Sequence, residues 1–275
     1  MLWRLIINEE PLDGSVNMAI DETLMLSQTK QERLPTLRFY SWKPAALSLG
    51  YFQRANSEID LDACRKTGVD VVRRLTGGRA VLHDKEVTYS ICVAQEEPWI
   101  PPTITASYRY FSQGIAKGLS KMGIDSQMSM PRAAYGQTQK QVGSPACFDA
   151  PSHYEMTVVG RKLAGSAQVR KNGVILQHGS LLLEFDPEKL AGLFLPSSTG
   201  KGQKLADALS ERAISLSEMM DPMPSWDAVC VALIGGFQEA LGLDFLVKGL
   251  TEGEQQESHE LSENKYRQDS WTLRR

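Results

Sequence analysis

Runs of apolar residues, separated by glycine, proline and charged residues, mark the expected secondary structure of the chain. The first runs are short and rich in β-branched, aromatic and leucine side chains, which is typical of strands. Residues 14–28 instead repeat apolar side chains at helical spacing, with Ser15 or Asn17 as the candidate N-cap. The strands expected from this pattern are residues 3–8, 36–42, 46–52 and 69–74.

The central part of the chain combines a strand, a helix and a hairpin. Apolar and hydroxyl side chains alternate over residues 87–91, which predicts a strand with one buried face. Apolar side chains recur at helical spacing over residues 108–122 and most clearly over residues 226–241. The sequence Lys-Asn-Gly at residues 171–173 is a tight-turn signal, so residues 162–184 predict a β-hairpin.

Together these elements predict an α/β (α+β) fold in one large domain. The chain has 275 residues, enough to bury a sizeable core. We expect a catalytic-type domain over residues 1–250, with its core at about 32–248, because no repeat or low-complexity linker divides this part. Residues 251–275 are charged and polar and predict a helical tail on the surface.

Composition and charge exclude several classes of protein. Hydrophobic residues make up 42% and charged residues 23% of the chain, close to the averages for globular proteins. A net charge of −3 argues against a protein that coats nucleic acid, so acidic partners would have to dock on local basic clusters. The two candidate clusters are Arg73, Arg74 and Arg79, and Arg161, Lys162, Arg170 and Lys171.

Membrane and metal-binding patterns are missing from the sequence. No apolar run approaches the roughly 20 residues that a membrane span requires, and the first residues lack the features of a signal peptide. The cysteines show neither C-x-x-C nor Cys/His zinc spacing. We therefore expect free thiols in a reducing cytoplasm and no bound metal.

Cys147 is the thiol with the best claim to chemistry. Cys92 and Cys230 fall on apolar faces, where a cysteine serves as a small hydrophobic residue. Cys147 instead lies in a proline-rich loop, where a structural and a nucleophilic role are equally open. A nucleophilic cysteine needs a cation or base beside it, because only the thiolate attacks well. Lys162 is the leading candidate partner, with His153 and His178 as rival bases and an ordinary turn lysine as the simpler alternative.

Residues 73–84, "RRLTGGRAVLHD", form the second dense stretch. Gly77 and Gly78 allow the backbone to approach a ligand closely, although such a pair is more often only a turn. The stretch lacks the lysine and spacing of a P-loop and the G-x-G-x-x-G of a dinucleotide site.

Several of these segments, in this order, identify the chain with a known family. The segments "NMAIDE", "VVRRLTGGRAVLHDKEVTYS", "CFDAPSHYEMTVVGRKLAGSAQVR" and "LQHGSLLL" resemble the biotin/lipoate protein ligase and octanoyltransferase superfamily over roughly residues 1–250. Within it, the chain is most similar to the octanoyltransferases that use an acyl carrier protein. The resemblance implies a mixed β-sheet flanked by helices, with an acyl-binding tunnel beside residues 73–84.

The resemblance also implies an activity and its residues. Cys147 would carry the acyl group as a thioester, and Lys162 would lower the pKa of that thiol and transfer protons. The donor would be octanoyl-acyl carrier protein, and the acceptor a lysine of a lipoyl domain such as the glycine cleavage system H protein. A cytoplasmic monomer that needs no cofactor is expected. The residues expected to bind the acyl substrate are Arg74, Gly77, Gly78, His83, Gly165 and Ser166, with backbone N–H groups of the two glycine turns as candidate oxyanion donors.

Three alternatives remain open. An ATP-dependent lipoate–protein ligase needs no cysteine, but it usually carries Gly-Gly-Gly-Ala where this chain has Gly77-Gly78-Arg79-Ala80. An amidotransferase that moves octanoyl groups between lipoyl domains would use the same cysteine. A catalytically inactive acyl-binding module would have no use for the Cys147–Lys162 pair.

Overall fold

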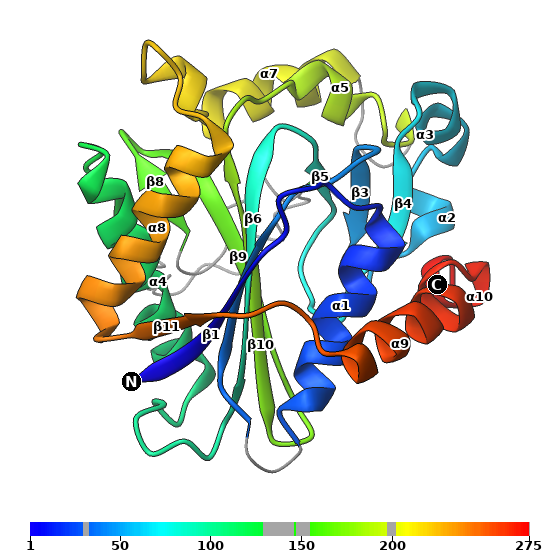
Figure 1. The fold of residues 1–275 in the computed structure, drawn as a ribbon. Helices are drawn as coiled ribbons and strands as arrows, with labels where there is room; N and C mark the ends of the chain where they lie inside the picture. Colours follow the sequence, from blue (N-terminus) through cyan, green and yellow to red (C-terminus); the bar gives the residue numbers. More distant parts are fainter. Residues whose placement is uncertain (30–32, 129–145, 147–154, 197–201, 275) are drawn as a thin grey trace, which may run out of the picture.

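An eight-stranded mixed sheet runs through the centre of the molecule (Figure 1). The computed structural model describes residues 1–29, 33–128, 146, 155–196 and 202–274. The first three strands in spatial order are parallel and every further pairing is antiparallel, which confirms the expected mixed sheet. In order across the sheet they are β11 (Asp244–Val247), β1 (Leu2–Ile7), β2 (Thr36–Tyr40), β6 (Glu86–Ala94), β10 (Val174–Leu182), β9 (Arg161–Lys171), β8 (Met156–Val158) and β7 (Gln127–Met128).

A second, three-stranded sheet lies beside the first, in the order β4 (Asp70–Arg73), β3 (Ala46–Leu49) and β5 (Val81–His83). Its own core, which includes Leu47, Leu49 and Phe194, packs against short helices. These helices are α2 (Ala55–Glu58), α3 (Leu61–Thr67), α5 (Pro187–Ala191) and α7 (Gly202–Arg212). The strands expected at 3–8, 36–42, 46–52 and 69–74 are thus confirmed as β1 to β4, divided between the two sheets.

Two long helices, α4 (Ile104–Lys121) and α8 (Trp226–Leu241), cover one face of the large sheet and confirm the helices expected there. Their contact is close because glycines meet across it. A Cβ atom added at Gly236 would lie 2.3 Å from the backbone nitrogen of Gly118. On β6, Val87, Tyr89 and Ile91 enter the core under these helices, as the alternating pattern predicted.

On the opposite face of the sheet lies α1 (Gly14–Ser27). Its N-cap is Asp13, whose side chain accepts a hydrogen bond from the N–H of Val16 at 2.9 Å. The expectation of Ser15 or Asn17 was therefore wrong. Asn17 is fully buried, and its amide donates to the carbonyls of Leu12 and Ser41.

The expected hairpin at residues 162–184 is confirmed as β9 and β10. Asn172 and Gly173 have φ of 52° and 75°, the paired positive values that a two-residue hairpin turn requires. In the described part of the chain, β8 pairs with β9 only from Arg161 to Ala164. Beyond this pairing, the carbonyl of Ser166 on β9 accepts a hydrogen bond from the Tyr108 hydroxyl of α4 at 3.2 Å.

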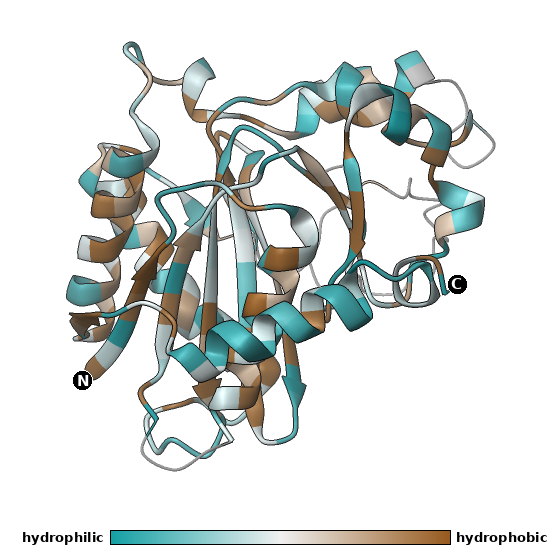
Figure 2. Ribbon diagram, turned by 45° about the vertical axis from the view of Figure 1, so that its right-hand side comes forward, coloured by the Kyte–Doolittle hydropathy of each residue, from teal (hydrophilic) through white to brown (hydrophobic). Residues whose placement is uncertain are grey.

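The last residues form three short helical segments: α9 (Glu252–Leu261), the π-helical turn η3 (Ser262–Tyr266) and α10 (Asp269–Thr272). Figure 2 shows hydrophilic residues along the visible face of α9. Toward the protein, Arg4 donates two hydrogen bonds of 2.8 Å to Glu254, and the buried Tyr266 donates to Glu22 at 2.7 Å. None of the helices in the described ranges is long and apolar enough to span a bilayer.

The glycine contact between α4 and α8 yields a prediction about stability. Gly236→Ala should lower the free energy of unfolding by about 1–3 kcal/mol, because the new methyl group meets backbone atoms of α4 that cannot move aside. The adjacent Gly235→Ala is the matched control: its Cβ would meet only the flexible side chain of Lys121, 3.4 Å away. That variant should be neutral or gain about 0.5–1 kcal/mol from helix propensity. Urea unfolding of both variants tests this, and equal effects would contradict it.

Candidate functional site

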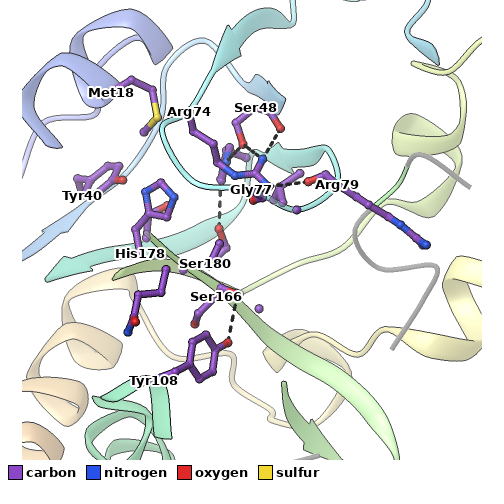
Figure 3. A pocket seen from close by; sticks show the side chains of 18 of the residues that line it. Met18, Tyr40, Ser48, Arg74, Gly77, Arg79, Tyr108, Ser166, His178 and Ser180 are labelled. Carbon is purple, nitrogen blue, oxygen red and sulfur yellow. Dashed lines mark hydrogen bonds between the residues drawn. The ribbon is translucent and has the colours of Figure 1, made fainter. Parts of the chain in front are cut away.

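A pocket of about 460 Å³ lies between the large sheet, the small sheet, α1 and α4. Figure 3 shows Met18 and Tyr40 on one side of it and Ser166 and Tyr108 on another. All six residues expected to bind the acyl substrate line this pocket, although they come from two distant segments. These are Arg74, Gly77, Gly78, His83, Gly165 and Ser166.

Arg74 holds the pocket wall together. It is 4% exposed, and its guanidinium lies beside Ser48 and Gly77 (Figure 3). Nη1 donates to the carbonyl and hydroxyl of Ser48 at 2.7 and 3.1 Å, and Nη2 donates to the carbonyls of Gly77 and Arg79 at 2.9 and 2.8 Å. Nε donates to the hydroxyl of Thr76 at 3.1 Å. These five bonds match the five N–H groups of a guanidinium, so Arg74 shapes the glycine turn rather than presenting donors to a ligand.

His178 connects this turn to α1. Its Nε2 lies 2.7 Å from the Thr76 hydroxyl and its Nδ1 lies 3.2 Å from Asp21. Burial lowers the pKa of His178, outweighing the opposing effect of Asp21. Burial acts to raise the pKa of Asp21, but the hydrogen bond with His178 and the charge of Arg38 lower it overall. A neutral imidazole therefore donates from Nδ1 to the carboxylate and accepts the Thr76 proton at Nε2.

His83 repeats this arrangement on the other side of Arg74. Its Nε2 lies 2.7 Å from the Ser48 hydroxyl and its Nδ1 lies 2.7 Å from Glu86. The imidazole stacks on Trp42, with ring centroids 4.1 Å apart and planes 11° apart. Arg74 thus joins two chains of the same kind, each running from a hydroxyl through a histidine to a buried carboxylate.

The glycine turn also needs space on its outer side. A Cβ atom at Gly50 would lie 1.9 Å from the carbonyl oxygen of Gly78, so only glycine permits this approach. Gly78 itself has φ of 99°, a value that favours glycine. The turn at Gly77–Gly78 thus packs closely against the backbone of Gly50, and its close approach to a ligand stays a prediction.

Lys162 lies at the edge of the pocket. The residue is 3% exposed, and its Nζ donates to Glu155 Oε1 at 2.6 Å. Its side chain crosses the pocket-lining Gly165, where an added Cβ atom would lie 2.9 Å from Nζ. Lys162 lies in the first residues of β9, close to the expected start of the strand, but it is a buried, ion-paired lysine and not a solvated turn residue.

Cys147 and His153 lie outside the described residues. The residue that precedes Cys147 is described: Ala146 is buried and forms a β-bridge with Ala80, at the end of the glycine turn. The other cysteines are free thiols buried among apolar side chains, as expected for Cys92 and Cys230. Burial raises the pKa of Cys64 to about 11.

The basic clusters differ from expectation. Arg73, Arg74 and Lys162 are buried, and the arginines donate mainly to backbone carbonyls. Arg170 donates to the carbonyls of Pro101, Pro102 and Thr103, ahead of α4. The expectation that Arg73, Arg74 and Lys162 form docking surfaces was wrong, because these side chains are buried and their charges are used inside the fold.

Sequence reasoning missed Asp21, Glu86 and Glu155 as members of the site. Each is a carboxylate paired with a predicted residue: Asp21 with His178, Glu86 with His83 and Glu155 with Lys162. The signal was present for Glu86 alone, three residues after His83 in the sequence. The other two pairings depend on tertiary structure or on a register shift in β8.

Comparison with known proteins gives a consistent result. Residues 13–238 match the profile of the lipoyl protein ligase A/B catalytic domain. The octanoyltransferase LipM of Kyrpidia tusciae is 44% identical over 273 residues, with 99% of each chain covered. The octanoyltransferase LipM of Bacillus subtilis is 41% identical over 274 residues, which cover 99% of this chain and 98% of that one.

Solved structures agree on the fold. The bipartite lipoate protein ligase of Thermoplasma acidophilum superposes with a TM-score of 0.82 at 28% identity, covering 99% of this chain and 96% of that chain. A lipoate-protein ligase A with bound ATP superposes with a TM-score of 0.81 at 27% identity, covering 99% of each.

The burial of His178 predicts a pH-dependent stability. Because its folded pKa lies below the ordinary value of about 6.5, the unfolded state binds more protons as the pH falls below that value. The free energy of unfolding should therefore fall between about pH 7 and pH 5. His178→Asn, which retains a donor near Asp21, should flatten this fall, whereas His259→Asn on the exposed face of α9 should not. Urea unfolding across this range tests it, and an unchanged slope in His178→Asn would contradict the assignment.

Proposed function

Because the chain belongs to the lipoyl protein ligase A/B catalytic-domain family and is an acyltransferase that transfers octanoyl groups in protein lipoylation, we propose that it works through a thioester on Cys147. The donor is octanoyl-acyl carrier protein. The acceptor is a lysine of a lipoyl domain, with the glycine cleavage system H protein as the favoured substrate. Family members act on lipoyl-domain proteins; the particular donor and acceptor are part of the proposal.

One observation carries the proposal: the buried Lys162 ammonium lies at the edge of the pocket lined by all six expected acyl-binding residues. The bridge between Ala146 and Ala80 adds support. Ala146 is the residue that precedes Cys147 in the sequence, and it is anchored at the end of the glycine turn.

The pocket suits an acyl chain with a polar head. Met18, Trp42 and Tyr108 supply apolar or aromatic surface, and the Gly165–Gln168 backbone supplies a polar edge. Burying a methylene is worth about 0.8 kcal/mol, so the six methylenes of an octanoyl chain contribute up to about 5 kcal/mol. The volume of about 460 Å³ is within the usual range of small-molecule sites.

The chemistry balances without ATP. In the first half-reaction, the Cys147 thiolate attacks the donor thioester, and the Lys162 ammonium gives its proton to the departing thiolate of the carrier. In the second, neutral Lys162 takes one proton from the acceptor ammonium, whose amine attacks the Cys147 thioester. The amide forms as its nitrogen loses a second proton to solvent, and Cys147 leaves as the thiolate. Lys162 is charged again, ready for the next cycle.

The alternative reactions differ in the acyl donor that each requires. A ligase activates a free acid with ATP, and ligases are among the solved structures that share this fold. The curated relatives at 41–44% identity are octanoyltransferases, which favours transfer from a thioester donor. An amidotransferase would take the octanoyl group from a lipoyl domain, so the donor must be tested directly.

We place the reaction in the cytoplasm, since Cys64, Cys92 and Cys230 are unpaired thiols, and we take a monomer as the working state.

The first prediction from this proposal concerns the acyl-enzyme. Incubated with octanoyl-acyl carrier protein and no ATP, the protein should gain the mass of one octanoyl group, and hydroxylamine should remove it. Cys147→Ala should gain nothing, whereas Cys64→Ala, which removes a buried thiol elsewhere, should react normally. Intact-mass spectrometry measures this. Acceptor modification that requires ATP and free octanoate would assign the protein to the ligases, and an adduct formed only from an octanoylated lipoyl domain would assign it to the amidotransferases.

The second prediction separates the chemistry of Lys162 from its structural role. Lys162→Met should slow single-turnover acylation by about 10²-fold or more. It should also cost about 3–5 kcal/mol of stability, because the Glu155 carboxylate is left buried without its cation. The double variant Lys162→Met/Glu155→Gln removes both charges, so it should recover much of the stability and none of the rate. Near-normal acylation in a folded double variant would refute the role of Lys162.

A further inference from the structure

The ion pair between Lys162 and Glu155 is more deeply buried than the ion pair of the neighbouring Arg161. Both residues are buried, with side-chain exposures of 4% and 6%, and the Nζ to Oε1 distance is 2.6 Å. Elsewhere on this hairpin, Arg161 pairs with Glu218 at 2.8 Å with side-chain exposures of 31% and 41%. Of these two ion pairs, only the Lys162–Glu155 pair is removed from water, whereas the neighbouring Arg161–Glu218 pair stays partly exposed to solvent.

Contacts along the length of Lys162 position its backbone, its side chain and its ammonium group. The carbonyl of Lys162 accepts a hydrogen bond from the N–H of Ile214 at 2.9 Å, which anchors the backbone. The side chain then crosses the face of Gly165, where a Cβ atom would lie 2.7 Å from Cε. Glu155 holds the far end. A lysine side chain normally has many rotamers, and this path leaves Nζ little freedom.

We propose that Glu155 is a positioning residue for acyl transfer: it fixes the Lys162 ammonium over Gly165 and keeps it charged until the donor thioester reacts. This inference rests on the proposed function and extends it. An ammonium group is favoured by a carboxylate within hydrogen-bond distance, whereas burial alone would favour the neutral amine. With Glu155 present, Lys162 therefore begins the cycle with a proton to give.

The same pair suits the second half-reaction. After Lys162 has given its proton to the departing thiolate, a neutral amine remains beside the Glu155 carboxylate. That carboxylate favours the return of a proton to the amine, so Lys162 is a better acceptor for a proton of the incoming lysine. Glu155 changes neither its bonds nor its own charge in either step, and its action is through Lys162 alone.

Other charged groups lie on the elements next to Lys162. Arg161, on the same strand, is paired with Glu218 of the 3-10 turn η2 (Leu216–Glu218). Glu211 and Arg212, at the end of α7, are exposed to solvent. Glu155 contacts Lys162 directly, with Nζ and Oε1 2.6 Å apart.

The test is the pH dependence of single-turnover acylation by octanoyl-acyl carrier protein, followed by intact mass. In Glu155→Gln the alkaline limb, where the ammonium is lost, should move to lower pH by about 1–3 units. Glu155→Asp restores the charge and should bring the limb back toward its wild-type position. Glu239→Gln is the control, because it removes a surface carboxylate that pairs with Lys117 and Lys121 far from the pocket, and it should leave the profile unchanged.

A variant that folds poorly would not decide the matter alone, so a double-mutant cycle accompanies the profile. If Glu155 acts through Lys162, adding Glu155→Gln to Lys162→Met should cause no further loss of rate per folded enzyme. An equal loss in both backgrounds, or an alkaline limb that stays in place in folded Glu155→Gln, would overturn the inference and leave the pair a structural contact. Failure of the wild-type protein to form any adduct would instead refute the proposed function.

Discussion

The buried guanidinium of Arg74 is the interaction on which the pocket depends. Its five hydrogen bonds hold the Thr76–Arg79 turn against β3, and its donors reach two hydroxyls that lead through His178 and His83 to Asp21 and Glu86. A buried acceptor left without its donor costs about 1–3 kcal/mol, so the network is stable only when complete. The network around Arg74 therefore links segments that are distant in sequence: α1, β3, β6 and β10.

This network determines what the site can do. The donors of Arg74 are paired within the wall, and in the proposed function the apolar surface of Met18, Trp42 and Tyr108 accepts the hydrocarbon chain. The proposed proton-transfer residue, Lys162, lies at the edge of the pocket, where the pairing of β8 with β9 ends and the lysine side chain crosses Gly165. In the proposed mechanism, binding and chemistry are thus carried by separate sets of residues, the wall around Arg74 and the buried Lys162–Glu155 ion pair at the edge.

The sequence predicted most of the fold because local rules decide it. The alternation in β6, the helical spacing of α8 and the turn at Asn172–Gly173 depend on neighbouring residues alone. Tertiary contacts decide the remainder. Arg73 and Arg74 resemble a surface cluster in sequence, but carbonyls of distant loops surround them. The pocket residues followed from the family resemblance, whereas Glu155 did not, because its pairing with Lys162 depends on the burial of both side chains in the folded protein.

The most direct test of the account is a crystal structure of the protein after octanoylation in the absence of an acceptor. The account predicts a thioester on Cys147, with the octanoyl chain against Met18, Trp42 and Tyr108 and the Lys162–Glu155 pair within reach of the sulfur. An acyl group on another residue, or a chain lying outside the pocket that Arg74 holds, would contradict it.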